Sequence, residues 1–331
     1  MTSTEIFSVL SDGEWHSGEA IAGRLAVTRS AVWKSIEQLR ELGLHIEAHT
    51  NRGYRLPAPC AALSAKAIES ELNAFAASRA HIEVCWQLES TNSELLGREA
   101  PSAGEYTVLL AENQLGGRGR RGRVWQARLG ASLCLSLATR FEPLPRDMPS
   151  LTLVVGVCVR AALQSLGAED VRLKWPNDLL IDDKKVGGIL VELRAEAGGP
   201  AHVVIGIGLN LKLDADDRER IRNTGNEPAD LASQGITTAA RNTLAAVLIN
   251  ECVSGLELFR DAGFAPFFPT WSAADSLRDR AVTLIDGQGQ RTGIARGIDE
   301  SGALRFEIAP GREEVILAGE LSLRPKSSAA T

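Results

Sequence analysis

Apolar residues near the start of the chain recur at helical spacing. Val32, Ile36 and Leu39 are four and three residues apart, which predicts one face of an amphipathic helix. Thr28 can cap the start of this helix, and Gly43 can end it. Two shorter helices are predicted before it, at residues 6–10 and at residues 18–25 after an N-cap at Ser17.

A short hairpin is predicted after these helices. Strands are expected at residues 44–48 and 54–56, joined by a turn-rich tip at residues 50–53. Three helices followed by a hairpin are the plan of a winged helix-turn-helix. We assign residues 1–60 to this unit.

The central part of the chain alternates helices and strands. Residues 187–194 and 202–211 predict neighbouring strands with no helix between them, so they should pair antiparallel and the sheet should be mixed. We assign residues 61–270 to this unit. Helices are predicted at 64–77, 91–99, 151–166 and 241–260, and strands at 82–88, 106–111, 132–141, 171–174, 187–194 and 202–211.

The last part of the chain, residues 278–324, contains short predicted strands separated by glycine-containing turns. This pattern favours a small β-barrel, in a unit assigned to residues 271–331. The predicted fold class is therefore α+β, with a winged helix-turn-helix, a central mixed sheet and a C-terminal β-barrel.

Composition narrows the functional classes. The 331 residues are 44% hydrophobic and 24% charged, as in a globular protein, and the net charge of −6 provides no general attraction to DNA or membranes. A nucleic-acid contact must therefore come from a local patch. The chain contains neither a signal-peptide pattern nor an apolar run of about 18 residues, so we expect a cytoplasmic protein without a membrane partner.

The cysteines and histidines do not form a metal-binding pattern. The five cysteines are widely spaced and the five histidines lack ligand-like spacing, so we expect no dedicated protein metal site. Most of the cysteines should be buried as small apolar residues.

Residues 116–123 read GGRGRRGR, with four glycines and four arginines. Glycine allows the backbone to approach a ligand closely, and arginine donates to phosphate and carboxylate groups. We therefore interpret this segment, called the Arg/Gly loop, as an anion-binding loop. A solvated basic turn or a disordered nucleic-acid-binding tract are the alternatives.

Further polar segments lie next to predicted strands. Ser90, Thr91 and Asn92 stand at a strand-to-helix junction, where they can cap the helix or face a ligand. Gln114 precedes the Arg/Gly loop, and Trp125 after it is either a lid or a core residue.

Two more segments complete the candidate chemistry. Residues 174–178 read KWPND and stand at the end of a predicted strand. Lys174 at this position is expected to have an anionic partner. Lys185 follows seven residues after this motif. Paired glycines lie in the next two strands, at Gly187 and Gly188 and at Gly206 and Gly208. Glycines in strands mark a bulge or a close ligand, which predicts a flat floor for a thin ligand.

Taken together, these segments resemble the bifunctional biotin–protein ligases of the biotin-operon repressor type over almost the whole chain. The residues that carry the resemblance are Ser90-Thr91-Asn92, Gln114, the Arg/Gly loop through Trp125, KWPND, Lys185 with GGILVE (187–192), GIGLN (206–210) and RGID..GAL (296–304). The resemblance implies a class II synthetase-like mixed sheet with an N-terminal winged helix and a C-terminal SH3-like barrel.

The resemblance also implies the activity. Biotin and ATP with Mg²⁺ form biotinoyl-5′-AMP, and a lysine of biotin carboxyl carrier protein then takes up the biotin. Lys185, Arg120 and Asp178 are the implied catalytic residues. The implied biotin-binding residues are Ser90, Thr91, Asn92, Gln114, Gly117, Arg118, Gly119, Arg120, Lys185, Gly188, Gly206 and Gly208. The implied residues for ATP and the adenylate are Arg120, Arg121, Arg123, Trp125, Lys174, Asn177 and Asn210.

Two details of the implied site are specific to this chain. Asp178 or Lys185 is the candidate that helps the acceptor lysine, whose unperturbed pKa is about 10.4, to lose its proton. Relatives often have an aromatic residue after GIGLN that closes over adenine, but residues 211–235 contain none.

The winged helix predicts a second activity. Arg29, Ser30, Trp33 and Lys34 begin its third helix and Arg52 lies in the wing, where DNA contacts are expected. We expect a homodimer on operator DNA, promoted by biotinoyl-5′-AMP as corepressor. Because residues 1–60 carry six basic against seven acidic side chains, a protein-binding winged helix is the alternative.

Two other functions share parts of this pattern. A lipoate–protein ligase has the same catalytic core, and a ligand-sensing regulator could have lost catalysis. The intact Arg/Gly loop, KWPND and Lys185 argue against the regulator.

Overall fold

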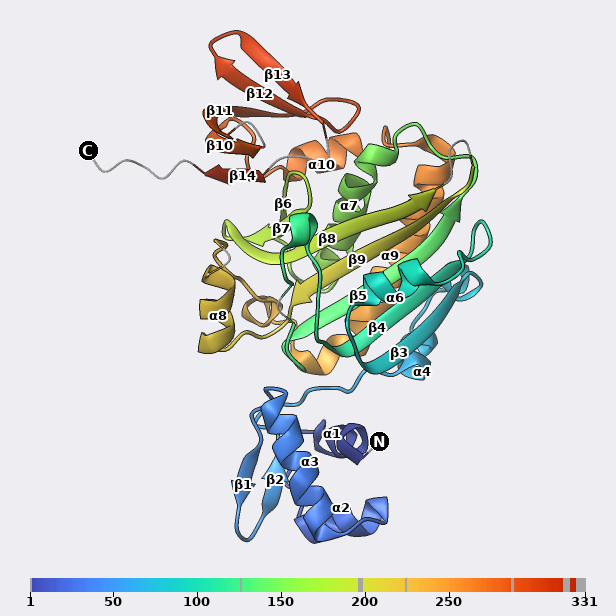
Figure 1. Cartoon of the computed structure of the whole chain (residues 1–331), viewed down its shortest axis with the longest axis vertical. Coiled ribbons are helices and arrows are strands. Elements are labelled where there is room, and N and C mark those ends of the chain that lie inside the picture. Colours follow the sequence, from blue (N-terminus) through green and yellow to red (C-terminus); the bar gives the residue numbers. More distant parts are fainter. Residues whose placement is uncertain are drawn as a thin grey trace, which may run out of the picture.

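Three units follow one another along the long axis of the molecule. The computed structural model describes residues 2–125, 127–195, 199–223, 225–286, 289–317 and 322–325. Figure 1 shows a small helical unit with a hairpin at one end, a large sheet backed by long helices in the middle, and a small sheet at the other end.

The N-terminal unit has the predicted three helices and hairpin. Ser17 and Thr28 cap the second and third helices, because their side-chain oxygens accept hydrogen bonds from backbone N–H groups three residues later. The elements are α1 (Thr2–Leu10), α2 (Gly18–Leu25), α3 (Arg29–Glu41), β1 (Glu47–His49) and β2 (Gly53–Arg55). The strand predicted at residues 44–48 is wrong in its bounds, because Leu44 and Ile46 are buried in the core of this unit before the strand begins.

The central sheet has seven strands in the order β3-β4-β5-β9-β8-β7-β6. Only β3 and β4 pair in parallel among these strands, and the other pairs are antiparallel, so the mixed sheet is confirmed. The strands are β3 (Ala80–Leu88), β4 (Tyr106–Gln114), β5 (Ser132–Phe141), β6 (Arg172–Lys174), β7 (Asp178–Ile181), β8 (Lys184–Ala195) and β9 (Ala201–Asn210).

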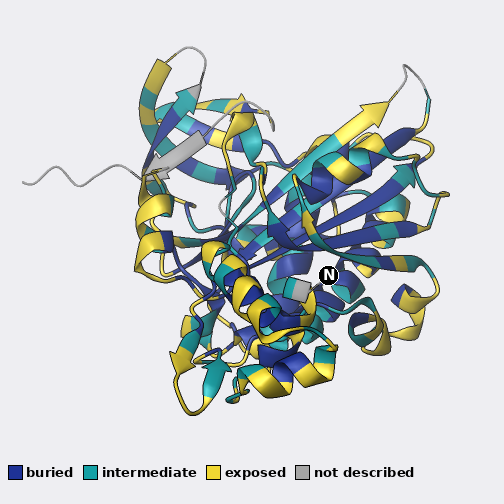
Figure 2. Ribbon diagram, turned by 60° about the horizontal axis from the view of Figure 1, so that its bottom comes forward, coloured by how far each residue is buried: buried dark blue, intermediate teal, exposed yellow. Residues whose placement is uncertain are grey.

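Different helices cover the two faces of this sheet. The long helices α7 (Leu151–Ser165) and α9 (Arg241–Ala262) pack behind it, and the short α6 (Thr91–Gly97) lies in front (Figure 1). Figure 2 shows the buried residues concentrated in the strands and the exposed ones on the outer helices. The stretch Met148–Ser165 is long and apolar enough to span a membrane, but 61% of it is buried inside the protein. It is therefore a core helix.

Several elements differ from the prediction. The single helix expected at residues 64–77 is wrong, because Asn73 caps a second helix and divides the segment into α4 (Ala65–Ser70) and α5 (Ala74–Ala77). The strand β7 and the helices α8 (Ala215–Arg222) and α10 (Phe268–Ala274) were not predicted. Short 3₁₀ turns occur at Arg120–Gly122, Met148–Ser150, Leu231–Gln234 and Thr238–Ala240.

The C-terminal unit is a five-stranded antiparallel sheet in the order β13-β12-β11-β10-β14. Its strands are β10 (Arg280–Asp286), β11 (Gly289–Ile298), β12 (Leu304–Ala309), β13 (Arg312–Ile316) and β14 (Ser322–Pro325). The Trp175 indole donates a 3.0 Å hydrogen bond to the Gly302 carbonyl and so joins this unit to KWPND. The expected division at residue 270 falls inside α10, and the unit boundaries remain predictions.

The cysteines are free thiols, and most of them are buried, as predicted. Cys60, Cys134, Cys158 and Cys252 are buried, and Cys85 is half-buried.

Candidate active site and DNA-binding surface

The register of three strands makes a floor with little side-chain bulk. Gly208 lies between Cys134 and Gly188, and Gly206 lies between Ser136 and Leu190. Side chains alternate along a strand, so this face is bare at two successive positions of β9 while the other face packs against the core helices. The predicted glycine floor is therefore present on the front face of the sheet.

A pocket above this floor brings together residues from all the predicted motifs except RGID..GAL (296–304). Its lining includes Ser90, Thr91, Asn92, Gln114, Arg118, Gly119, Arg120, Arg121, Arg123, Trp125, Lys174, Asn177, Asp178, Lys185, Gly188, Gly206, Gly208 and Asn210. Gly117 and Gly187 lie outside the lining. The lining also includes Val124, Cys134, Leu135, Ile221 and Asn226, which sequence reasoning missed. Ile221 is the lone apolar side chain larger than alanine in α8, a signal that could have identified it.

At one end of the pocket, hydroxyl and amide groups form a connected network. Ser90 caps α6, and both the backbone N–H and the hydroxyl of Thr91 donate to Gln114 Oε1, at 2.7 and 3.1 Å. The buried Ser136 hydroxyl lies 2.6 Å from both Thr91 Oγ1 and Asn92 Oδ1. Because the Gln114 oxygen already accepts twice, this side chain can offer only its NH₂ group to a ligand.

The Arg/Gly loop closes on itself beside the pocket. The backbone N–H of Trp125 donates to the Gly117 carbonyl (2.8 Å), and the backbone N–H of Gly119 donates to the Arg123 carbonyl (2.7 Å). Arg121 adopts a left-handed conformation with φ of 58°, which turns the chain sharply. The loop is thus a defined turn that can present several guanidinium groups on one side.

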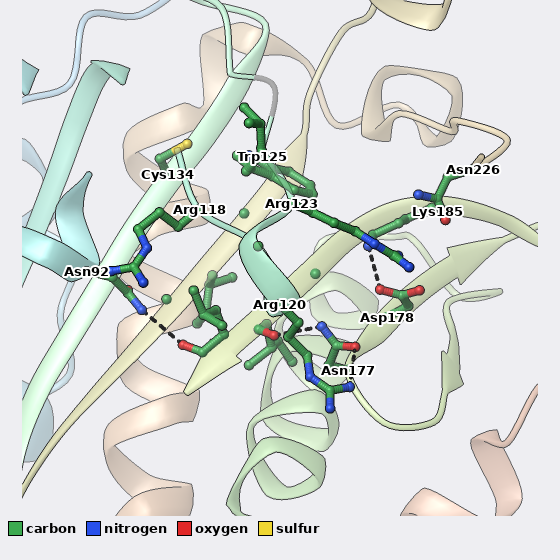
Figure 3. A pocket seen from close by; sticks show the side chains of 18 of the residues that line it. Asn92, Arg118, Arg120, Arg123, Trp125, Cys134, Asn177, Asp178, Lys185 and Asn226 are labelled. Carbon is green, nitrogen blue, oxygen red and sulfur yellow. Dashed lines mark hydrogen bonds and ion pairs between the residues drawn. The ribbon is translucent and has the colours of Figure 1, made fainter. Parts of the chain in front are cut away.

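The four arginines of this loop differ in their surroundings. Arg118 pairs with Glu192 at 3.1 Å, whereas Arg120 donates to Asn177 Oδ1 at 3.4 Å (Figure 3). Burial lowers the pKa of the Arg120 guanidinium, and the neighbouring Arg121 and Arg123 lower it further. Arg120 is the half-buried arginine of the loop, while Arg118, Arg121 and Arg123 are exposed.

Asp178 organises the two lysines on the opposite side of the pocket. Its carboxylate lies 2.5 Å from Lys185 Nζ and 3.6 Å from Lys174 Nζ (Figure 3). Burial raises the pKa of Asp178, but the two ammonium groups outweigh burial and hold it below its ordinary value. The anionic partner that Lys174 required is therefore inside its own motif.

Trp125 lies directly on the floor. A Cβ at Gly208 would be 2.5 Å from its ring, and Lys185 Nζ is 5.9 Å from the ring centre. Burial raises the pKa of the Cys134 thiol below it to about 12, so this cysteine is neutral. Likewise, a Cβ at Gly206 would be 2.3 Å from Asn92 Oδ1. The bare floor is thus what allows Trp125 and Asn92 to sit at these positions.

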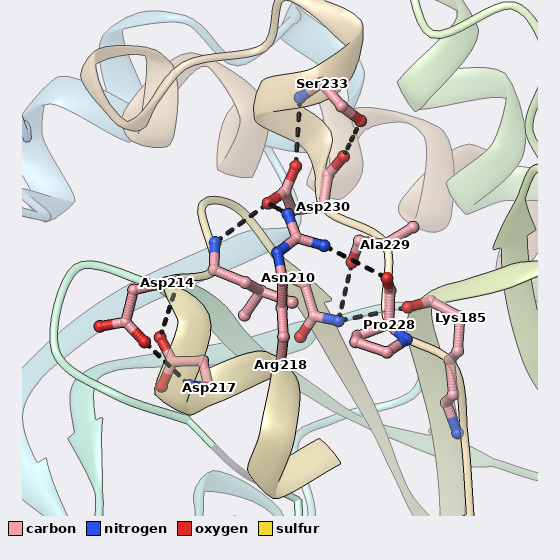
Figure 4. A network of polar contacts seen from close by, with 10 residues as sticks. Lys185, Asn210, Asp214, Asp217, Arg218, Pro228, Ala229, Asp230 and Ser233 are labelled. Carbon is pink, nitrogen blue, oxygen red and sulfur yellow. Dashed lines mark hydrogen bonds and ion pairs between the residues drawn. The ribbon is translucent and has the colours of Figure 1, made fainter. Parts of the chain in front are cut away.

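Asn210 fixes the segment that follows β9 to the edge of the pocket. Its amide donates to the carbonyls of Lys185 (3.3 Å) and Ala229 (3.1 Å), as Figure 4 shows. Lys185 N–H in turn donates to the Glu227 carbonyl (2.7 Å). These bonds hold the residues after α8 beside Lys185. Asn226 from this segment and Ile221 from α8 reach the pocket.

The charge of the lining selects a class of ligand. Six lining residues are cationic and one, Asp178, is anionic. Such a concave, positively charged site concentrates anions. The pocket can therefore hold carboxylate and phosphate groups together.

The winged helix presents the predicted DNA-binding residues to solvent. Arg29, Ser30, Trp33 and Lys34 are all exposed on α3, and 58% of the Trp33 surface is accessible. In the wing, the Arg52 and Arg55 guanidiniums stack on the Trp15 ring at 4.5 and 4.7 Å from its centroid. Sequence reasoning missed Trp15 and Arg55 in this role, because the stack joins segments far apart in the chain.

The fold and the pocket define a ligase with an attached winged helix. Residues 85–210 match the biotin/lipoate A/B protein ligase family, residues 3–55 an HTH domain, and residues 279–324 the biotin protein ligase C terminal domain. The chain is 41% identical over 320 residues to the bifunctional ligase/repressor BirA of Salmonella typhimurium, covering 96% of each protein. It is 33% identical to the protein of that name from Bacillus subtilis, covering 95% of each.

The chain therefore belongs to the bifunctional ligase/repressor family of biotin–protein ligases. A solved structure of a biotin protein ligase from Aquifex aeolicus, in complex with biotin and ATP, is also similar. It has a TM-score of 0.62 and 25% identity, covering 74% of this chain and 99% of that one. The predicted family, fold class and enzyme class are confirmed.

Proposed function

We propose that the pocket joins biotin and ATP into biotinoyl-5′-AMP and then transfers biotin to a lysine of biotin carboxyl carrier protein. In the first step a biotin carboxylate oxygen attacks the α-phosphorus of ATP, and the bond to pyrophosphate breaks. In the second step the lysine nitrogen attacks the biotin carbonyl, loses a proton, and AMP leaves. The gathering of six cations above a glycine floor carries this proposal.

The first step brings two anions together, so cations must offset their repulsion. Lys185 and Arg120 both line the pocket and are suited to hold the carboxylate and the α-phosphate. Lys174, Arg121, Arg123, Asn177 and Asn210 are assigned to the nucleotide, which Mg²⁺ accompanies. Consumption of ATP also fits a cytoplasmic protein.

The other end of the pocket fits the ureido ring of biotin. Ser90, Thr91, Asn92 and Gln114 supply hydroxyl and amide groups there, and Gln114 offers its NH₂ group to the ureido oxygen. A ligand that lacks an acceptor for the Gln114 NH₂ group would forgo this hydrogen bond, at a cost of about 1–3 kcal/mol. This chemistry favours biotin over lipoate.

Asp178 is a poor candidate for the base in the second step. Lys185 and Lys174 hold the pKa of its carboxyl below the ordinary value, so Asp178 accepts a proton from the acceptor lysine less readily than an ordinary carboxylate would. We assign Asp178 to holding Lys185 and Lys174 in place. Lys185 remains the candidate residue near the transferred group.

Incubation with biotin, Mg-ATP and a biotin carboxyl carrier domain tests the ligase. We expect the carrier domain to gain the mass of biotin on one lysine, and pyrophosphate exchange into ATP to depend on biotin and not on lipoate. Exchange with lipoate would favour the lipoate ligase. DNA binding without any transfer would favour the non-catalytic regulator.

We also propose that biotinoyl-5′-AMP promotes a homodimer that represses biotin biosynthesis genes. The exposed Arg29, Ser30, Trp33 and Lys34 on α3 and the stacked wing residue Arg52 support this role. A mobility shift on DNA upstream of a biotin operon, with and without biotin and ATP, tests it. Absence of ligand-dependent binding would leave the ligase and favour protein contact by the winged helix.

A further inference from the structure

Glu192 lies outside the lined pocket but contacts two of its lining residues. It stands on the front face of β8, opposite Val204 of β9, one step beyond the row of Ser136, Gly206 and Leu190. Its side chain is 18% exposed. A carboxylate held this close to the floor requires polar partners.

Each oxygen of this carboxylate has a different partner. Oε1 lies 3.1 Å from Arg118 Nη2 at the start of the Arg/Gly loop, and Oε2 accepts a 3.0 Å hydrogen bond from Asn92 Nδ2 in the first turn of α6. Arg118 Nη1 also donates to Ser93 Oγ at 3.2 Å. Glu192 therefore bridges the loop and the helix that border the same end of the pocket.

We propose that Glu192 is a positioning residue that clasps the Arg/Gly loop onto α6 through Arg118. The charge of Arg118 is compensated by Glu192, so this arginine anchors the loop, while Arg120, which donates to the neutral amide oxygen of Asn177, is left to meet the ligand. The same carboxylate orients Asn92. This inference rests on the proposed ligase function.

If Glu192 positions the loop, its loss should change KM for biotin and leave kcat nearly unchanged. Loss of the Glu192 charge frees the first half of the loop but leaves Lys185, Arg120 and Asp178 in place. Biotin should then bind less tightly and the adenylate should escape more often, while the chemical step proceeds at its normal rate. Because half of the Arg118 side chain is exposed, the effect should be moderate.

Glu192→Gln tests this division with a side chain of the same shape. We expect KM for biotin in pyrophosphate exchange to rise about three- to tenfold with kcat within about twofold. The fraction of adenylate released to solvent should rise too. Glu83→Gln is the matched control, because Glu83 is also a half-buried sheet carboxylate that pairs with an arginine, Arg98, at 2.9 Å.

Two outcomes would overturn the clasp. One is a Glu192→Gln enzyme with unchanged KM and unchanged adenylate release, and the other is an equal loss of kcat in Glu192→Gln and Glu83→Gln. If the unaltered protein shows no biotin-dependent exchange, the proposed function fails instead. Hydrogen exchange of residues 116–123 still tests the clasp in that case. The exchange rate should increase in Glu192→Gln and should not change in Glu83→Gln.

A separate observation concerns residues 128–131, which follow the Arg/Gly loop and which we call the junction segment. Arg128 donates to the Gly43 carbonyl after α3, and Leu129 is part of the buried core of the winged helix. The Gly130 carbonyl faces the Cys60 thiol at 4.0 Å. The Ala131 carbonyl accepts from the backbone N–H groups of residues 211 and 212, at 2.8 and 3.1 Å.

Arg128 extends the junction segment to α8. Its Nη1 lies 2.7 Å from Asp214 and 3.1 Å from Asp217, the two carboxylates of the capping box that begins this helix (Figure 4 shows the box). The other end of α8 supplies Ile221 to the pocket. The junction segment therefore contacts the winged helix and α8 at once, and it follows the Arg/Gly loop along the chain.

We infer that the junction segment transmits ligand binding from the pocket to α3. A ligand that orders the Arg/Gly loop restrains the chain that leads to Arg128, and a ligand that orders α8 fixes the carboxylates that Arg128 binds. Arg128 in turn holds the Gly43 carbonyl after α3. This coupling acts within one chain and needs no dimer.

Hydrogen exchange with Arg128→Ala tests the inference without DNA. In the unaltered protein, biotin and ATP should slow exchange in residues 215–222 and in residues 29–43. In Arg128→Ala the ligands should still slow exchange in 116–123, but their effect on 29–43 should fall at least threefold. Arg146→Ala, which removes an exposed arginine from another loop, is the control. Equal slowing of 29–43 in Arg128→Ala, or no slowing in the unaltered protein, would overturn the coupling.

Discussion

Neighbouring lysines on β8 have opposite surroundings. Lys185 reaches the pocket and pairs with Asp178, whereas Lys184 is exposed. Lys185→Ala should abolish adenylate formation, because it removes the ammonium group proposed to hold the biotin carboxylate and the α-phosphate together. Lys184→Ala removes the same charge and should retain activity. Biotin-dependent pyrophosphate exchange measures both, and comparable loss in the two variants would contradict the assigned role.

The lowered pKa of Asp178 predicts that the free energy of unfolding depends on pH. Its folded-state pKa is lowered, so ionisation favours the folded state above the unfolded pKa of about 3.9, and this contribution is lost as the pH falls through the folded pKa. Asp178→Asn should therefore lower the free energy of unfolding by about 2 kcal/mol at pH 7. The difference from the unaltered protein should shrink below pH 4.

Urea unfolding at pH 7 and at pH 3 to 4 measures this difference. Asp183→Asn is a useful comparison, because Asp183 forms an exposed pair with Arg280 at the tip of the same hairpin. A difference for Asp178→Asn that stays constant across this pH range would contradict the lowered pKa.

At the scale of elements, Arg120 is the side chain through which the Arg/Gly loop contacts KWPND across the pocket. Its guanidinium reaches Asn177, so the loop meets KWPND through this side chain. Arg120→Gly should let biotinoyl-5′-AMP escape, and free adenylate should then label lysines of bystander proteins. Arg120→Ala separates side-chain loss from added backbone freedom. Mass spectrometry of a bystander protein measures labelling, and tight retention of the adenylate by Arg120→Gly would contradict the prediction.

Elements with local signals could be predicted from the sequence. Ser17 and Thr28 marked helix starts by their own chemistry, and the alternating glycines of β9 marked a bare strand face. The helix α8 has six charged residues out of eight and no apolar stripe, so periodicity could not reveal it. Glu192 escaped prediction because its importance comes from Asn92 and Arg118, which are remote in sequence and are brought together by the sheet.

At the scale of the molecule, the three units were predictable but their contacts were not. Each unit has its own pattern of apolar periodicity, so their order along the chain followed from the sequence. The core of the winged helix, however, includes Leu129 and packs against Trp86, which belong to the central unit. Phe7 packs against Trp86 with the two rings tilted and their centroids 5.9 Å apart. No local pattern assigns these side chains to a neighbouring unit.

The linker between the winged helix and the central sheet is held by a buried ion pair. Arg241 of α9 is fully buried, lies 2.7 Å from Glu112 of β4, and donates to the Ala61 carbonyl at 3.1 Å. Glu112 accepts a 2.6 Å bond from Leu63 N–H. Glu112 is two residues from Gln114, so this pair joins the linker to the strand that borders the pocket.

Arg241→Met should destabilise the whole chain by about 3–5 kcal/mol, because it leaves the Glu112 carboxylate buried without its cation. Adding Glu112→Gln should recover part of that loss, since a neutral amide is cheaper to bury and its oxygen still accepts from Leu63 N–H. Arg305→Met, which breaks an exposed pair with Glu313, is the control and should change stability by less than about 1 kcal/mol. Denaturant unfolding measures all three variants. If the double variant is no more stable than Arg241→Met, the cost lies in lost packing rather than in the unpaired carboxylate.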